Sequence, residues 1–117
     1  MGKLIVTLAP FIILPQNVGM KRDVALAKLR LFEDRLRARG IRALYLFGST
    51  ARNESRESSD LDLLFEYDEA SRFSLFDQAG AMLELSDGLG VKVDLVSRFG
   101  LRPRVRDRIE RDMFRIF

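Results

Sequence analysis

The sequence contains no cysteine and no histidine, and each absence excludes a group of functions. Without cysteine there is no disulfide and no thiolate chemistry, which fits a protein of the reducing cytoplasm. Without histidine there is no Ser-His-Asp triad, no histidine-bound zinc and no imidazole base. Any catalysis must therefore use carboxylates, basic side chains, hydroxyls, backbone groups or a bound metal ion.

The chain is short, and its composition is that of a globular protein. It has 117 residues, of which 47% are hydrophobic and 32% are charged, so general disorder is not expected. This length fits one small domain and leaves no room for a second domain that would bind a substrate. We expect one domain over residues 20–117, preceded by an extension over residues 1–19.

The extension contains a short apolar stretch, LIVTLAPFIILP, from Leu4 to Pro15. It is too short to span a membrane and is interrupted by Pro10, and it lacks the small-residue cleavage pattern of a signal peptide. Three interpretations stay open: an extra strand or partner-binding arm, a weak signal peptide, or an upstream extension of a domain that starts near Met20. We expect no membrane association.

The net charge is +3, and arginine dominates the basic residues, especially between Arg98 and Phe117. Arginine suits both phosphates and protein carboxylates. The same segment contains Asp107, Glu110 and Asp112. We therefore expect a solvated helix face on which acids pair with neighbouring arginines, and no direct nucleic-acid binding.

Hydrophobic periodicity predicts an α/β domain. Helices are predicted over residues 21–39, 72–85 and 104–114, strands over residues 41–47, 60–67 and 91–96, and a short helix from about residue 50. In the second long helix, Phe73, Phe76, Ala79 and Leu83 are expected to share the buried face. This order predicts a small mixed sheet with helices packed against it.

Three aspartates lie in or beside two of the predicted strands. Asp60 and Asp62 are two residues apart, so their side chains point to the same face. Asp94 lies between Val93 and Leu95 in the last strand. If that strand neighbours the first pair, three carboxylates converge and their repulsion requires a cation. Mg²⁺ binds carboxylates together with substrate phosphates, and two such ions can stabilise both oxygens of a phosphoryl transfer.

A glycine and a serine follow the preceding strand. Gly48 allows the backbone to approach a ligand closely, and a helix that starts there directs its N–H groups at an anion. The Ser49 hydroxyl can donate to a phosphate oxygen, and Arg52 can add positive charge, although an exposed loop arginine also needs no function. We predict that this turn binds the phosphates of a nucleotide.

The segment GSTARNESRESSDLDLL, residues 48–64, resembles the nucleotidyltransferase signature: Gly-Ser, a short arginine-bearing stretch, then Ser-Asp-x-Asp. Over residues 21–115 the layout is similar to minimal nucleotidyltransferase (MNT) domain proteins, including MntA-type antitoxins. The resemblance implies a polymerase-β-like fold of the α/β (α+β) class. One departure is Asn53, where the family often has glycine; asparagine tolerates a left-handed backbone better than most residues.

The resemblance also implies roles for the site residues. Gly48 and Ser49 would hold the nucleotide phosphates, with Arg52 beside them. Asp60 and Asp62 would bind Mg²⁺, and Asp94 would be a third metal ligand or the base for the attacking hydroxyl.

The activity implied by the resemblance is Mg²⁺-dependent transfer of AMP from ATP to a hydroxyl. In the family the acceptor is commonly a HEPN-domain toxin, in some systems a tyrosine of it, and the transferase acts as an antitoxin. Two alternatives stay open: an antitoxin that binds and occludes its partner without catalysis, and a transferase acting on a small molecule of the aminoglycoside type. Assembly as a homo- or hetero-oligomer is left open as well.

Overall fold

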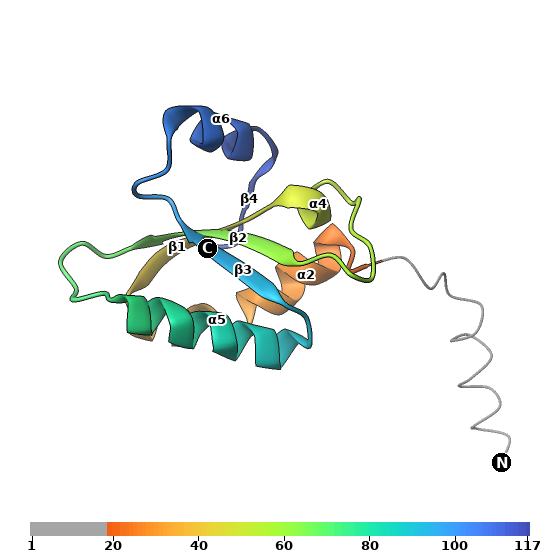
Figure 1. Ribbon diagram of the computed structural model, residues 1–117. Helices are drawn as coiled ribbons and strands as arrows, with labels where there is room; N and C mark the ends of the chain where they lie inside the picture. The colour runs from red at the N-terminus through yellow and green to blue at the C-terminus, as the bar shows by residue number, and fades with distance from the viewer. Residues whose placement is uncertain (1–18) are drawn as a thin grey trace, which may run out of the picture.

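The computed structural model describes residues 19–117, in which helices and strands alternate (Figure 1). In chain order the elements are α2 (Arg22–Arg30), α3 (Glu33–Ala38), β1 (Ile41–Phe47), α4 (Gly48–Ala51), β2 (Leu61–Tyr67), α5 (Leu75–Leu89), β3 (Val93–Ser97), α6 (Pro103–Asp112) and β4 (Phe114–Arg115). No helix in this part of the chain is long and apolar enough to cross a membrane. The interpretations given for residues 1–18 lie outside the described residues.

The strands form one mixed sheet in the order β3-β2-β1-β4. β2 and β3 are parallel, whereas β1 is antiparallel to both β2 and β4. A parallel pair needs a crossover connection, and α5 supplies it between β2 and β3. The predicted α/β class with a mixed sheet is confirmed.

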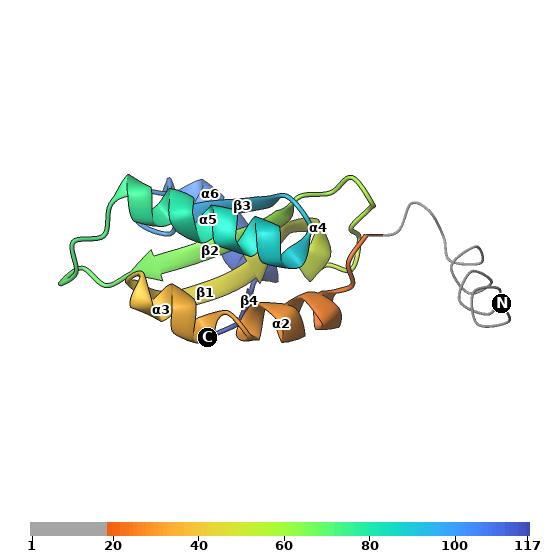
Figure 2. The same cartoon turned by 90° about the horizontal axis from the view of Figure 1, so that it is seen from below.

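The sheet separates two unequal layers. Helices α2, α3 and α5 cover one face, and α6 alone lies over the other (Figures 1 and 2). Alternation along β2 sends Leu61, Leu63 and Phe65 into the large core beneath the three helices. Leu64 belongs to the small cluster beneath α6. Asp62 therefore also faces the α6 side, where one helix covers the sheet incompletely.

The first predicted helix is two helices. The turn at Leu31 and Phe32 separates α2 from α3. Phe32 is buried there, and its ring lies so close to Gly88 of α5 that a Cβ at Gly88 would collide with it. The break thus lets an aromatic side chain enter the core between α2, α3 and α5.

The buried face predicted for the second long helix is wrong. Phe76 and Leu83 are 88% and 61% exposed, while Ala81, Leu85 and Leu89 are buried. The sequence of α5 carries two overlapping apolar stripes, and packing against the sheet selected the other one. The helix begins after a capping box formed by Ser74 and Asp77. It continues past residue 85 to Leu89 and ends where Gly90 adopts a left-handed conformation with φ +69°.

The last helix ends at Asp112, and a strand that the sequence did not predict follows it. Phe114 and Arg115 pair with β1 opposite Leu46 and Tyr45. A strand of two residues has no periodicity of its own, and its partner lies far away in the chain.

Candidate active site

Asp62 and Asp94 are direct partners in the pairing of β2 with β3. Because the strands are parallel and in register, both side chains leave the sheet on the same face. Asp62 is half-buried and Asp94 is exposed. The predicted convergence of these two aspartates from neighbouring strands is therefore found.

Burial and like charge act together on Asp62. Burial raises the pKa of the Asp62 carboxyl, the negative charges of Asp94 and Asp60 raise it further, and Arg52 opposes them. The carboxylate thus stands in a cluster whose negative charge is only partly compensated by the chain itself.

Asp60 lies just outside β2, which begins at Leu61 and not at residue 60 as predicted. Its Oδ2 atom is 3.8 Å from Nζ of Lys92, the residue two positions before Asp94. The backbone N–H of Leu61 donates to the carbonyl oxygen of Lys92. Lys92 was not among the predicted site residues, since nothing in the local sequence indicates its partner.

The carboxylates do not form a preorganised metal-binding site. Within residues 19–117, no group of three acidic side chains is close enough to hold an ion. Asp60 is instead 3.8 Å from the ammonium group of Lys92. The donor chemistry nevertheless fits a hard divalent cation, because such an ion would relieve the charge that raises the pKa of Asp62. The role of the three aspartates as metal ligands stays a prediction.

Gly48 lies directly against Asp62. Its φ of +78° is in the left-handed region, and a Cβ at this position would collide with Oδ2 of Asp62. The left-handed backbone favours glycine, and any side chain at this position would have to displace the Asp62 carboxylate. The turn after β1 and the acidic strand β2 are therefore in contact.

Ser49 and Arg52 lie in and after α4, which is a single helical turn. Ser49 is half-buried, and its carbonyl oxygen accepts a hydrogen bond from Glu54 N–H. The Arg52 guanidinium lies 3.5 Å from Glu54 and 3.8 Å from Asp112 of α6, and it influences the charge of Asp62. The structure brings Arg52 to the acidic cluster; its contact with a nucleotide stays a prediction.

Asn53 has the left-handed conformation expected for it, with φ 57°. Its Oδ1 accepts a 2.8 Å hydrogen bond from the backbone N–H of Arg22 at the start of α2. The Arg22 guanidinium donates to the carbonyl oxygen of Ala51 at 3.1 Å. The beginning of α2 thus holds the turn that follows Gly48 and Ser49.

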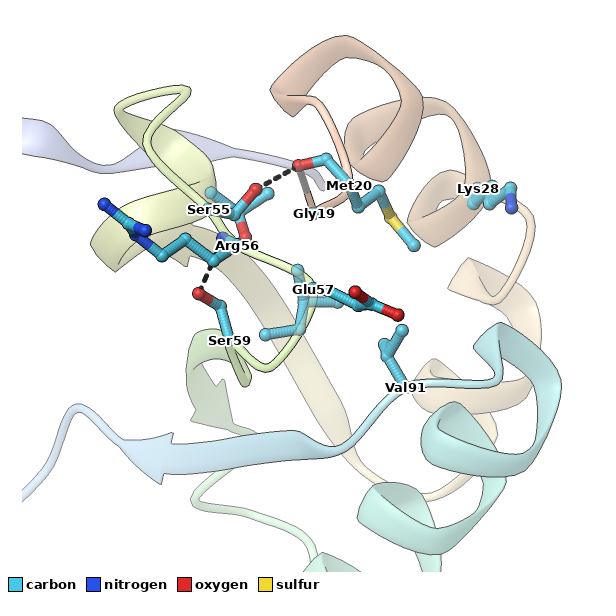
Figure 3. A pocket seen from close by; sticks show the side chains of 10 residues that line it. Gly19, Met20, Lys28, Ser55, Arg56, Glu57, Ser59 and Val91 are labelled. Atoms are coloured by element: carbon cyan, nitrogen blue, oxygen red, sulfur yellow. Dashed lines mark hydrogen bonds between the residues drawn. The ribbon is translucent and has the colours of Figure 1, made fainter. Parts of the chain in front are cut away.

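The rest of this loop is also attached to the start of α2. Ser55 Oγ donates to the carbonyl oxygen of Met20, and Ser59 Oγ accepts from Arg56 N–H (Figure 3). These residues line a hollow of about 340 Å³ beside Lys28 and Val91. None of the predicted site residues lines this hollow.

The sequence analysis did not predict a polar network that lies on the α6 side of the sheet. Tyr45 O–H donates to Glu66, which also accepts from Arg42 and Arg98, and Arg98 donates to Glu110 of α6 at 2.7 Å. Burial alone would raise the pKa of Glu66, but these hydrogen bonds outweigh it and hold the pKa below its usual range. The network ties α6 to the sheet.

Known proteins resemble this chain in sequence and in fold. A protein of Methanocaldococcus jannaschii named as a protein adenylyltransferase is 40% identical over 70 residues, covering 60% of this chain and 73% of the relative. The protein adenylyltransferase MntA of Thermococcus cleftensis is 33% identical over 74 residues, covering 63% of this chain and 73% of MntA.

Solved structures agree. A protein described as a minimal nucleotidyltransferase superposes with a TM-score of 0.70 at 38% identity, covering 81% of this chain and 95% of the other. Two toxin–antitoxin structures share the fold at lower identity. One, with AMP-PNP, has a TM-score of 0.63 at 18% identity over 77% of this chain and 72% of the other. The second is an AMPylated Shewanella oneidensis HEPN toxin with its MNT antitoxin. It has a TM-score of 0.57 at 17% identity, covering 79% of this chain and 71% of the other.

The nucleotidyltransferase domain family itself matches residues 29–116. This range includes Gly48, the loop after it, and all three aspartates. The chain therefore belongs to the nucleotidyltransferase domain family.

Proposed function

We propose that this chain is a protein adenylyltransferase that moves AMP from ATP to a hydroxyl of a HEPN-domain toxin, a tyrosine hydroxyl in particular, and so acts as an antitoxin. The observation that carries the proposal is the pairing of Asp62 with Asp94 beside Gly48. The relatives named as adenylyltransferases and the fold shared with toxin–antitoxin complexes support it.

Gly48, Ser49 and Arg52 would bind the phosphates. The tight turn at Gly48 brings this segment against Asp62, the Ser49 hydroxyl would donate to a phosphate oxygen, and Arg52 would supply positive charge. Asp112 and Glu54 keep Arg52 beside the site until phosphate oxygens replace them.

Asp60 and Asp62 would hold Mg²⁺, which when bound would stabilise the negative charge of the transferring phosphoryl group. In the transfer, the acceptor oxygen forms a bond to the α-phosphorus as the bond from that phosphorus to the pyrophosphate oxygen breaks. Pyrophosphate leaves with the electron pair. Asp94, the most exposed of the three carboxylates, accepts the hydroxyl proton.

The experiment is label transfer. The purified chain, Mg²⁺ and an extract of its own cells are incubated with ATP labelled at the α- or the γ-phosphate, and the labelled protein is identified by mass spectrometry. We expect label from the α-phosphate only, on one protein, and none with the Asp62→Asn variant. Label from the γ-phosphate alone would indicate a kinase. Label on a small molecule, or a toxin neutralised with no label at all, would favour the two alternative functions.

A further inference from the structure

The arginines of α6 and β4, and the arginine just before α6, differ from most others in having no carboxylate partner in an ion pair within residues 19–117. They are Arg102, Arg104, Arg106, Arg108, Arg111 and Arg115. Within residues 19–117 none of them forms an ion pair, whereas most arginines elsewhere in that range do. All six are exposed.

The acids of α6 do not neutralise them. The sequence predicted that Asp107, Glu110 and Asp112 pair with neighbouring arginines, and the structure corrects this. Glu110 pairs with Arg98 at 2.7 Å and Asp112 with Arg52 at 3.8 Å, both outside the helix. In the described part of the chain Asp107 has no ion pair. The acids are used to attach α6 to the domain, and the positive charge remains on its outer surface.

Three of the arginines share one side of α6. Arg104, Arg108 and Arg111 are separated by steps of four and three residues, which places them on one helical face. Ile109 and Met113 lie on a different side and pack against the sheet. We call Arg104, Arg108 and Arg111 the arginine face.

This face adjoins the candidate active site. Arg111 lines a hollow of about 430 Å³ together with Arg52, Asp112 and Phe114. A molecule bound to the arginine face therefore lies beside the residue predicted to bind the nucleotide phosphates.

The composition of the surface indicates a protein partner. It contains arginine and no lysine, and Val105 and Phe114 are 43% and 39% exposed next to it. Arginine and aromatic residues are enriched in protein interfaces, while lysine is depleted.

We propose that the arginine face is the docking surface for the acceptor protein, which it engages through a carboxylate-rich surface. The inference rests on the proposed function, since it names how the acceptor of that reaction is held. Complementary charges across such an interface speed association and fix the orientation of the partner.

The test uses the acceptor that receives the α-phosphate label, purified, with the full chain. Steady-state kinetics compare wild type with the double variant Arg104→Glu/Arg108→Glu. The matched control is Arg30→Glu/Arg72→Glu, which has the same change in net charge at two exposed arginines away from α6 that form no ion pair within residues 19–117. We expect the KM for the acceptor to rise about tenfold or more in the α6 variant only, with kcat and the KM for ATP unchanged. Wild type should lose most of this advantage at high salt.

Three results would overturn the inference. One is an acceptor KM equal to that of wild type, and another is an equal rise in both variants. The third is a difference that disappears after nuclease treatment, which would mean that a nucleic acid bridges the two proteins. If wild type itself transfers no label, the proposed function fails first, and the inference falls with it.

Discussion

Asp62 and Asp94 occupy directly opposite positions in the parallel pairing of β2 with β3, next to a glycine whose Cβ would strike Asp62. Burial raises the pKa of the Asp62 carboxyl, and the negative charge of Asp94 beside it raises that pKa further. A structure keeps such an arrangement at a cost in stability, which is a signature of functional sites.

Replacement of Asp62 by asparagine should abolish transfer and preserve the fold. Asn keeps the shape of the side chain but removes the charge that would hold a cation, so we expect a loss of about 100-fold or more in kcat/KM. Label transfer under saturating ATP measures it. Asp68→Asn is a suitable control, since Asp68 is an exposed residue after β2. Activity retained in the Asp62 variant would contradict the assignment.

The same substitution should make stability depend less on pH. Because the folded-state pKa of Asp62 is raised, the native state holds this proton more tightly than the unfolded chain does. The free energy of unfolding therefore falls as the pH rises from the ordinary aspartate value through the raised one. Urea unfolding with EDTA between about pH 3 and pH 7 should show Asp62→Asn gaining stability relative to wild type as the pH increases. A constant difference across that range would contradict this.

Mg²⁺ should stabilise wild type, with a gain that grows as the logarithm of the Mg²⁺ concentration once that concentration exceeds the Kd. An ion that binds only the native state raises the free energy of unfolding, by about 2.7 kcal/mol when its concentration is a hundred times its Kd. The Tm rises as a result. The Asp62→Asn variant should show a much smaller rise in thermal scans with and without Mg²⁺. Na⁺ at equal ionic strength controls for screening, and an equal rise with both salts would argue against a site.

Much of this arrangement could be predicted from local sequence. β1 has the predicted bounds, residues 41–47, because a run of aromatic and branched residues between Gly40 and Gly48 specifies a strand. The left-handed conformation of Asn53 and the approach of Asp62 to Asp94 were also predicted, since each depends on backbone preference or on strand alternation.

The rest depends on partners that are distant in the chain. The contact of Asp60 with Lys92 and the link from Arg98 to Glu110 are set by how the elements pack. The buried face of α5 was predicted wrongly because two of its faces are apolar, and only the sheet decides between them.

Gly48→Ala should damage both stability and transfer, whereas Gly100→Ala should damage stability alone. The two glycines have similar φ angles, +78° and +84°, but a Cβ at Gly100 meets nothing within 4 Å while one at Gly48 meets the Asp62 carboxylate. Left-handed strain costs about 1–3 kcal/mol in either variant. Only Gly48→Ala should also displace Asp62. Equal transfer activities in the two variants would show that the Gly48 contact has no catalytic importance.

Asn53 offers a separate test of the loop. Asn53→Gly keeps the left-handed backbone but loses the acceptor for Arg22 N–H, so we expect a loss of about 1 kcal/mol, the usual net contribution of one hydrogen bond. Asn53→Asp keeps both features and should stay close to wild type. Asn53→Ala loses both and should be the least stable. Urea unfolding gives the order, and an alanine variant as stable as the glycine variant would contradict the conformational argument.

Arg98→Ala should loosen α6 from the sheet. Arg98 joins Glu66 at 3.0 Å to Glu110 at 2.7 Å, and all three side chains are less than one-third exposed, so we expect a loss of about 2 kcal/mol and faster proteolysis within α6. Arg98→Lys should recover only part of it, because an ammonium group lacks the fork that reaches both carboxylates. Arg72→Ala, at an exposed residue outside any ion pair of residues 19–117, should change stability by about 0.5 kcal/mol or less. If Arg98→Ala behaves like Arg72→Ala, the Arg98 network does not contribute to holding α6 on the sheet.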